Sequence, residues 1–147
     1  KIDRIDVDNK EFKVVDYKLS GKKPSRTDLE QGLSLQLPVY MFAAKKFLEM
    51  ENDSETLILG ADIYSLKYKD EEFGLNSVLP SSKEKKLSIE EISNVNQHLI
   101  NNSSDYIKQY VDNIVNGIYN LSTLIDREEK ICQYCNFKTV CRVKEQE

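Results

Sequence analysis

The sequence predicts a mixed α/β fold. Alternating apolar and polar residues near the N-terminus predict two strands. Two Ser/Thr-x-x-Glu motifs open segments with helical periodicity, and an apolar run between these segments predicts a further strand. The resulting order is strand, strand, helix, strand, helix, followed by a cysteine-bearing tail, which is typical of the α/β class.

Residues 1–17 are predicted to form a β-hairpin. Apolar and polar residues alternate on either side of the sequence DNKE at residues 8–11. If Asn9 and Lys10 are the central turn residues, the register of the hairpin places Asp3 opposite Asp16. One face of the hairpin is then apolar near the turn and carries Asp3, Asp16 and Lys18 at its far end.

The next elements are a loop and a helical segment. Residues 19–26 contain Gly21, Pro24 and three basic residues, which predicts a basic loop. The capping box TDLE at residues 27–30 opens a segment with helical periodicity that runs to about residue 50. Pro38 lies inside this segment, so we expect a kink or a restart near Gln36, with two shorter helices as the alternative.

The second half of the chain is predicted to contain one strand and one long helix. Residues 56–66 are rich in Leu, Ile and Tyr and predict a buried strand, whereas residues 67–87 are predicted to be irregular. The capping box SIEE at residues 88–91 opens a helix that is expected to reach about residue 120. The polar run NNSS at residues 101–104 is a candidate break in it.

Composition limits the classes of protein to be considered. The chain has 147 residues, of which 39% are apolar and 31% charged, as expected for a single globular domain over residues 1–147. Its net charge of −4 argues mildly against a pure DNA-binding module. No leader and no membrane-spanning run is recognised, and the chain starts at Lys1, so we expect the C-terminal part of a longer, cytoplasmic protein without a membrane partner.

The opposed carboxylates of the hairpin are the first candidate site. Two carboxylates on neighbouring strands repel each other unless a cation lies between them. Mg²⁺ suits such a pair, and a water that it binds can attack a phosphodiester. Lys18, on the same face, could stabilise the developing charge. The alternative is that these are solvated charges on an open hairpin face, the usual location of Asp and Lys.

The acid-x-Lys pattern by itself is weak evidence, because it also occurs at Asp8/Lys10, Glu11/Lys13, Glu84/Lys86 and Glu128/Lys130. The Asp16/Lys18 pattern differs from these in two ways. An apolar strand leads into it, and the hairpin register places a second Asp opposite its carboxylate.

Three short motifs carry a resemblance to a known family. IDRID at residues 2–6, VVDYK at residues 14–18 and QLPVY at residues 36–40 resemble motifs of the PD-(D/E)XK nucleases of the RecB and AddB type. The resemblance implies a restriction-endonuclease-like core: a mixed sheet with an N-terminal hairpin, flanking helices and a cysteine-bearing tail. It also implies that Asp3, Asp16 and the carbonyl of Tyr17 bind Mg²⁺ or Mn²⁺ and that Lys18 assists hydrolysis.

The third motif adds two candidate residues. Gln36 and Tyr40, four residues apart, would lie on one helix face, from which they could reach the substrate or Lys18. Taken alone, they are as well explained by an ordinary surface Gln beside a packed Tyr. The family resemblance favours the functional interpretation.

Cys132, Cys135 and Cys141 form a possible metal or cluster site in residues 130–142. The turn implied by Cys-x2-Cys lets two thiolates reach one metal or cluster. The spacing resembles the 4Fe-4S staple of AddB-type nucleases and of CRISPR-associated exonucleases, in which a fourth cysteine lies upstream. Zinc, or three unliganded thiols, are the alternatives.

Taken together, these features predict a Mg²⁺-dependent deoxyribonuclease, either an exonuclease or an endonuclease. The family resemblance implies a role in DNA end processing for recombination and repair, together with helicase-like segments or a helicase-like subunit as partner. The alternatives are a non-catalytic DNA-binding module with an iron-sulfur or zinc tail, and an inactive truncated scaffold.

Overall fold

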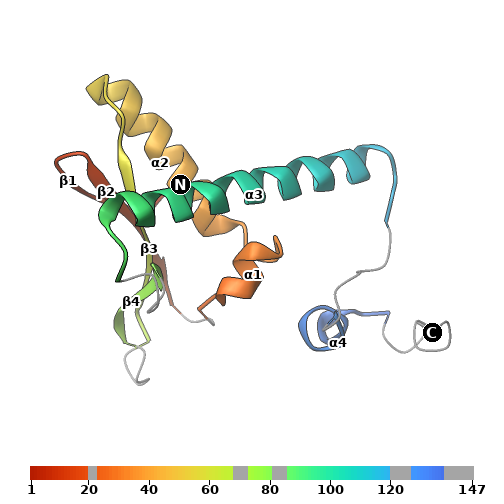
Figure 1. The fold of residues 1–147 in the computed structure, drawn as a ribbon. Helices are drawn as coiled ribbons and strands as arrows, with labels where there is room; N and C mark the ends of the chain where they lie inside the picture. The colour runs from red at the N-terminus through yellow and green to blue at the C-terminus, as the bar shows by residue number, and fades with distance from the viewer. Residues whose placement is uncertain (20–22, 68–72, 81–85, 120–126, 138–147) are drawn as a thin grey trace. The chain divides into compact units, whose positions relative to one another are not determined.

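The computed structural model describes residues 1–19, 23–67, 73–80, 86–119 and 127–137 (Figure 1). The chain divides into two compact units, Lys1–Val111 and Asp112–Glu147. The first unit contains the sheet with helices α1 and α2 and most of helix α3. The second contains the end of α3, the short helix α4 (Arg127–Lys130) and the 3-10 turn η2 (Cys132–Tyr134).

The predicted hairpin is present as strands β1 (Arg4–Asp8) and β2 (Glu11–Lys18). The turn lies at Asn9 and Lys10, and Asn9 has a φ of 55°, in the left-handed region that this residue type tolerates. Asp8 pairs with Glu11, and the register continues to Arg4 opposite Val15. The predicted register is therefore confirmed along the whole of β1.

The sheet has four strands in the order β1-β2-β3-β4, with β3 at Leu57–Ser65 and β4 at Gly74–Leu79. Strand β3 runs parallel to β2 and confirms the predicted strand. Strand β4 pairs antiparallel with β3. The prediction that residues 67–87 are irregular was wrong over β4, because Gly74, Asn76 and Ser77 have low strand propensity and pairing with β3 overrides it. Residues 68–72 and 81–85 of that range lie outside the described residues.

The predicted first helical segment is two helices, α1 (Arg26–Glu30) and α2 (Gln36–Asn52). The predicted capping box at residues 27–30 was wrong by two positions. Ser25 is the N-cap of α1, and it exchanges hydrogen bonds with Asp28, whose shorter carboxylate replaces the expected Glu. Pro38 lies in the first turn of α2, where no intrahelical N–H is needed, so α2 starts close to Gln36 as expected.

The turn between α1 and α2 depends on Gly32. Its φ is +69°, and a Cβ at this position would lie 2.5 Å from Cγ of Tyr106. Tyr110 also donates a hydrogen bond to the Gly32 carbonyl at 3.4 Å. Because this turn sets where α2 begins, its packing against the two tyrosines helps to place Gln36.

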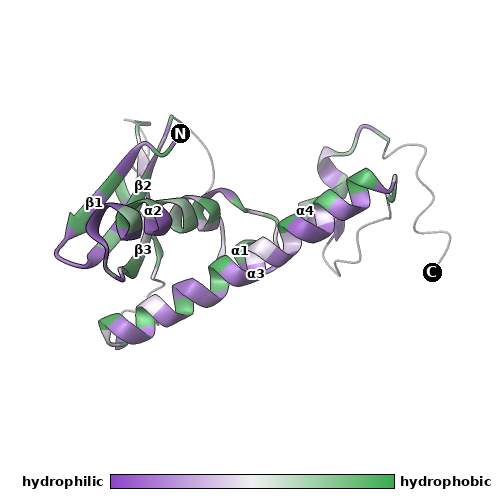
Figure 2. Cartoon of the chain, turned by 90° about the horizontal axis from the view of Figure 1, so that it is seen from above, coloured by the Kyte–Doolittle hydropathy of each residue, from purple (hydrophilic) through white to green (hydrophobic). Residues whose placement is uncertain are grey.

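Helix α3 spans Ile89–Val115. The predicted capping box is confirmed by reciprocal hydrogen bonds between Ser88 and Glu91. The candidate break at residues 101–104 does not occur, because Asn102 donates to the Glu30 carbonyl and Ser104 to the Ile100 carbonyl, which leaves the α3 backbone bonds undisturbed. Apolar and polar residues alternate around α3 as stripes (Figure 2).

The core lies on the face of the sheet that carries Phe12 and Val14 of β2 and Ile58, Ala61 and Ile63 of β3. Helices α1, α2 and α3 all contribute to it, and the helical members are Leu29, Leu37, Met41, Ala44, Leu48, Leu99 and Ile100. Ser93 and Asn96 of α3 hydrogen-bond the backbone of Ile58. Within the described ranges, no helix is both long and apolar enough to cross a membrane.

Candidate active site

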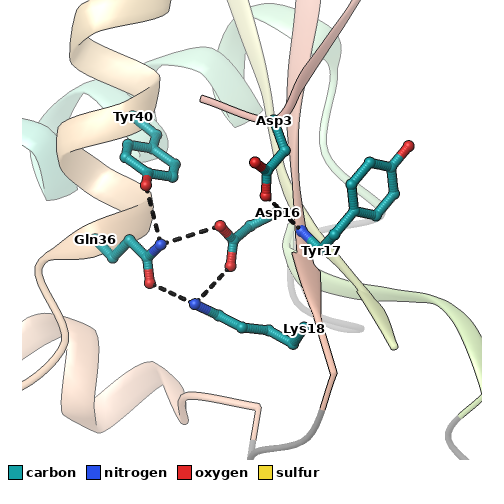
Figure 3. A network of polar contacts seen from close by, with 6 residues as sticks. All are labelled: Asp3, Asp16, Tyr17, Lys18, Gln36 and Tyr40. Carbon is teal, nitrogen blue, oxygen red and sulfur yellow. Dashed lines mark hydrogen bonds and ion pairs between the residues drawn. The ribbon is translucent and has the colours of Figure 1, made fainter. Parts of the chain in front are cut away.

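The end of β2 presents its side chains to opposite sides of the sheet. Because direction alternates along a strand, Asp16 and Lys18 lie on the helix-covered face and Tyr17 on the other. Figure 3 shows both side chains turned toward α2 and the Tyr17 ring turned away. The sequence VVDYK therefore places the two charged side chains, Asp16 and Lys18, on one face of the sheet at the end of β2.

Asp16 is buried, with 3% of its surface exposed. Its Oδ2 lies 2.8 Å from Lys18 Nζ, in an ion pair without hydrogen-bond geometry. Its Oδ1 accepts a hydrogen bond of 3.0 Å from Gln36 Nε2. This burial excludes the alternative in which Asp16 is a solvated surface charge.

Gln36 connects both charged groups to α2. Its Oε1 accepts a hydrogen bond of 2.8 Å from Lys18 Nζ, and its Nε2 donates to Tyr40 Oη at 3.1 Å as well as to Asp16. Asp16, Lys18 and Gln36 thus form a closed ring of contacts, with Tyr40 one turn along the helix (Figure 3). The i, i+4 spacing of Gln36 and Tyr40 places both on the face of α2 that meets the end of β2.

Asp3 lies one residue before β1, beside the same strand end. Its Oδ2 accepts a hydrogen bond of 3.0 Å from the backbone N–H of Tyr17. The carboxylates of Asp3 and Asp16 lie on the same side of the strand in Figure 3. The hairpin register thus brings the two predicted carboxylates to neighbouring positions, with the backbone of Tyr17 next to both.

The donor set fits a hard divalent cation. Asp16 Oδ2 is buried and accepts no hydrogen bond within the part of the chain that the structure describes. Asp3 uses one carboxylate oxygen for Tyr17 N–H, and its second carboxylate oxygen is a further hard donor. Two carboxylates completed by waters are the usual protein ligands of Mg²⁺. The described residues contain no cluster of three His, Cys, Asp or Glu that could hold a metal, so any such ion would depend on backbone or water oxygens as well.

Two of the three predicted cluster ligands lie in the described part of the second unit. Cys132 and Cys135 are free thiols in and directly after η2, and the Cys135 N–H donates to the Cys132 carbonyl at 3.1 Å. Cys135 is exposed and Cys132 partly so. Cys141 lies outside the described residues, so the three-cysteine set stays a prediction.

A second Asp–Lys pair with a buried aspartate was not predicted. Asp62 of β3 is 1% exposed, and its Oδ2 lies 2.8 Å from Lys13 Nζ. Lys13 belongs to one of the weak acid-x-Lys patterns, but its partner is not the nearby Glu11. The available signal was an Asp inside the apolar run LILGADIYS, a position where a charge needs a partner.

Comparison with known families agrees with this arrangement. Residues 1–142 match the model of the PD-(D/E)XK nuclease superfamily. No curated protein and no solved structure gives a significant match. The matched range includes the whole sheet and all the residues of the site. The family match is consistent with the mixed four-stranded sheet and its flanking helices, and we conclude that this chain belongs to the PD-(D/E)XK nuclease superfamily.

Proposed function

We propose that the chain hydrolyses DNA phosphodiester bonds with Mg²⁺ or Mn²⁺ at the site formed by Asp3, Asp16 and Lys18. The observation that carries this proposal is the buried Asp16, which meets Lys18 both directly and through Gln36. A purely structural ion pair needs no second carboxylate beside it. Here Asp3 adds one, at the cost of repulsion that a bound cation would relieve.

The proposed roles follow from position. The carboxylates of Asp3 and Asp16 and the carbonyl of Tyr17 would hold the cation, which supplies Lewis acidity toward a phosphate oxygen. Lys18 would stabilise the negative charge that develops on the phosphate, since an ammonium fixed in place needs little reorganisation during the reaction. Gln36 orients Lys18 and Asp16, and Tyr40 orients the amide of Gln36.

Family type and cellular role are further parts of the proposal. The motifs around Asp16, Lys18 and Gln36 favour the RecB/AddB type, for which we propose DNA end processing and a helicase-like partner. Linear and covalently closed DNA of the same sequence distinguish the cutting modes. An exonuclease degrades only the linear form, whereas an endonuclease also opens the closed form.

The site assignment is tested by Asp16→Asn, with Asp8→Asn as the control. Asp8 is exposed at the turn end of β1 and accepts a hydrogen bond from Asn9. We expect Asp16→Asn to abolish cleavage and to weaken Mn²⁺ binding at least tenfold in calorimetry, because one hard charged ligand is lost. Asp8→Asn should change neither. Cleavage by Asp16→Asn at the parental rate would show that the site assignment is wrong.

We also propose that Cys132, Cys135 and Cys141 ligate a 4Fe-4S cluster together with a further thiolate. The backbone turn from Cys132 to Cys135, closed by the Cys135 N–H on the Cys132 carbonyl, supports two of these ligands. Protein prepared anaerobically, with any upstream sequence included, should contain iron and sulfide and absorb visible light. Stoichiometric zinc in a colourless protein would show that these cysteines bind zinc and not an iron-sulfur cluster.

A further inference from the structure

The ring of Tyr17 belongs to an aromatic row on the face of the sheet opposite the site. Tyr17 of β2 is the register partner of Tyr64 of β3, and Tyr64 is the partner of Leu75 of β4. The rings of Tyr17 and Tyr64 meet edge to face, with centroids 5.6 Å apart and planes at 79°. Tyr64 meets Phe73 in the same way at 6.4 Å.

The aromatic row lies at the end of β2, where the strand is paired on one side only. Strand β1 pairs with β2 only as far as Val15, so Tyr17 and Lys18 extend beyond the hairpin ladder. On that side only the Asp3 carboxylate takes the Tyr17 N–H, among the contacts of the described residues. On the other side β3 pairs with Lys18, and the Leu66 N–H donates to the Lys18 carbonyl at 2.8 Å.

The Tyr17 ring is packed from the β3 side, where Tyr64 meets it edge to face. On β1, the Arg4 guanidinium pairs with Asp6. The pKa of Arg4 is raised above its ordinary value, by Asp6 first and by Tyr17 second. Since a strand side chain stands nearly perpendicular to the sheet, fixing the ring restricts rotation of the Tyr17 backbone. That backbone joins Asp16 to Lys18 and carries the carbonyl assigned to the metal.

We propose that Tyr64, supported by Phe73, is a positioning residue that sets the orientation of the Tyr17 backbone from the far side of the sheet. This inference rests on the proposed function, because the orientation of the Tyr17 backbone matters for catalysis only if its carbonyl binds the cation. Displacement of a reacting group by about 1 Å can lower a rate roughly 100-fold. Tyr64 would thus affect the reaction without touching substrate, metal or the side chains of Asp16 and Lys18.

The test compares Tyr64→Leu with Tyr64→Phe and Leu75→Ala. We expect Tyr64→Leu to weaken Mn²⁺ binding about tenfold and to lower kcat at least tenfold, with KM for DNA within twofold of the parent. Tyr64→Phe keeps the ring and should restore both values. Leu75→Ala removes an apolar side chain from the other neighbour of Tyr64, on strand β4, which does not pair with β2, and should leave both unchanged.

Three results would overturn the proposal. Parental Mn²⁺ affinity in Tyr64→Leu would show that the ring does not set the site, and an equal loss in Leu75→Ala would indicate a general effect on the sheet. A raised KM with unchanged kcat would show that this face of the sheet contacts DNA and does not position the Tyr17 backbone. If Tyr64→Leu does not fold, Phe73→Ala must show a smaller loss of Mn²⁺ affinity, about threefold.

The proposed function can fail separately from this inference. If the parental protein does not cleave DNA, the function is wrong, whereas the calorimetric comparison of Tyr64→Leu with Tyr64→Phe still decides whether Tyr64 orients the cation site.

Discussion

Among the described residues of the sheet, two Asp–Lys pairs have a buried aspartate and a partly exposed lysine, one pair on each face, and they differ in what surrounds them. Asp16 and Lys18 on the helix-covered face, and Asp62 and Lys13 on the opposite face, are each separated by 2.8 Å. Both aspartates are almost fully buried. An Asp–Lys pair at ideal distance is therefore not in itself evidence of a catalytic site in this molecule.

The difference lies in the additional polar groups. Asp16 has the Gln36 amide on one oxygen and Asp3 close by, and Gln36 also contacts Lys18. No amide bridges the pair formed by Asp62 and Lys13 among the described residues, and Asp62 Oδ1 has no hydrogen-bond partner there. The first pair resembles a site held ready for a ligand. The second neutralises a charge that the packing of the sheet has buried.

The largest expected effect is a difference in cleavage rate between variants of the two lysines, Lys18 and Lys13. Lys18→Ala should lower the cleavage rate by roughly 10²–10³-fold, the usual loss when one charge-stabilising group is removed from an active site. Lys13→Ala, assayed below its unfolding temperature, should retain activity within about threefold, because Lys13 lies on the other face and contacts none of the site. Similar losses in both variants would remove the distinction between the pairs.

The second expected effect concerns stability and falls on the other pair. Lys13→Ala leaves Asp62 buried without its cation and should lower the free energy of unfolding by about 2 kcal/mol. This is less than the ~3–5 kcal/mol typical of a fully buried pair, because the Lys13 side chain is 27% exposed and water can approach. Urea denaturation gives the value. A double variant Lys13→Met/Asp62→Leu should recover most of the loss, and failure to do so would indicate that the charges have another role.

The smallest expected effect tests the bridging amide. Gln36→Ala should reduce kcat about tenfold, because Lys18 and Asp16 lose the group that orients both of them. Gln97→Ala is the matched control, since Gln97 accepts a hydrogen bond of 2.9 Å from Lys45 away from the site. Single-turnover kinetics should show no change in the control. An equal loss in both variants would mean that Gln36 acts only through stability.

The hairpin and its charged end could be predicted from sequence because they are local. The turn residues set the register of β1 on β2, and Asp3, one residue before β1, follows from it to a position near Asp16. The contact between Gln36 and Lys18 spans 18 positions, and only the family resemblance suggested it. The partner of Lys13 could not be predicted, since Asp62 belongs to a strand whose register depends on the parallel crossover through α2.

The sequence alone therefore determined the hairpin, the two helix caps within two residues, and the charged groups that share one face of β2, all of which depend on alternation and short-range hydrogen bonding. The tertiary structure decided the rest. It made β4 a strand against its propensity and placed Gln36 through the packing of Gly32 on Tyr106. It also buried Asp16 and Asp62 in different polar surroundings and placed Tyr64 beside Tyr17. Such contacts join residues far apart in the chain and depend on how the elements pack.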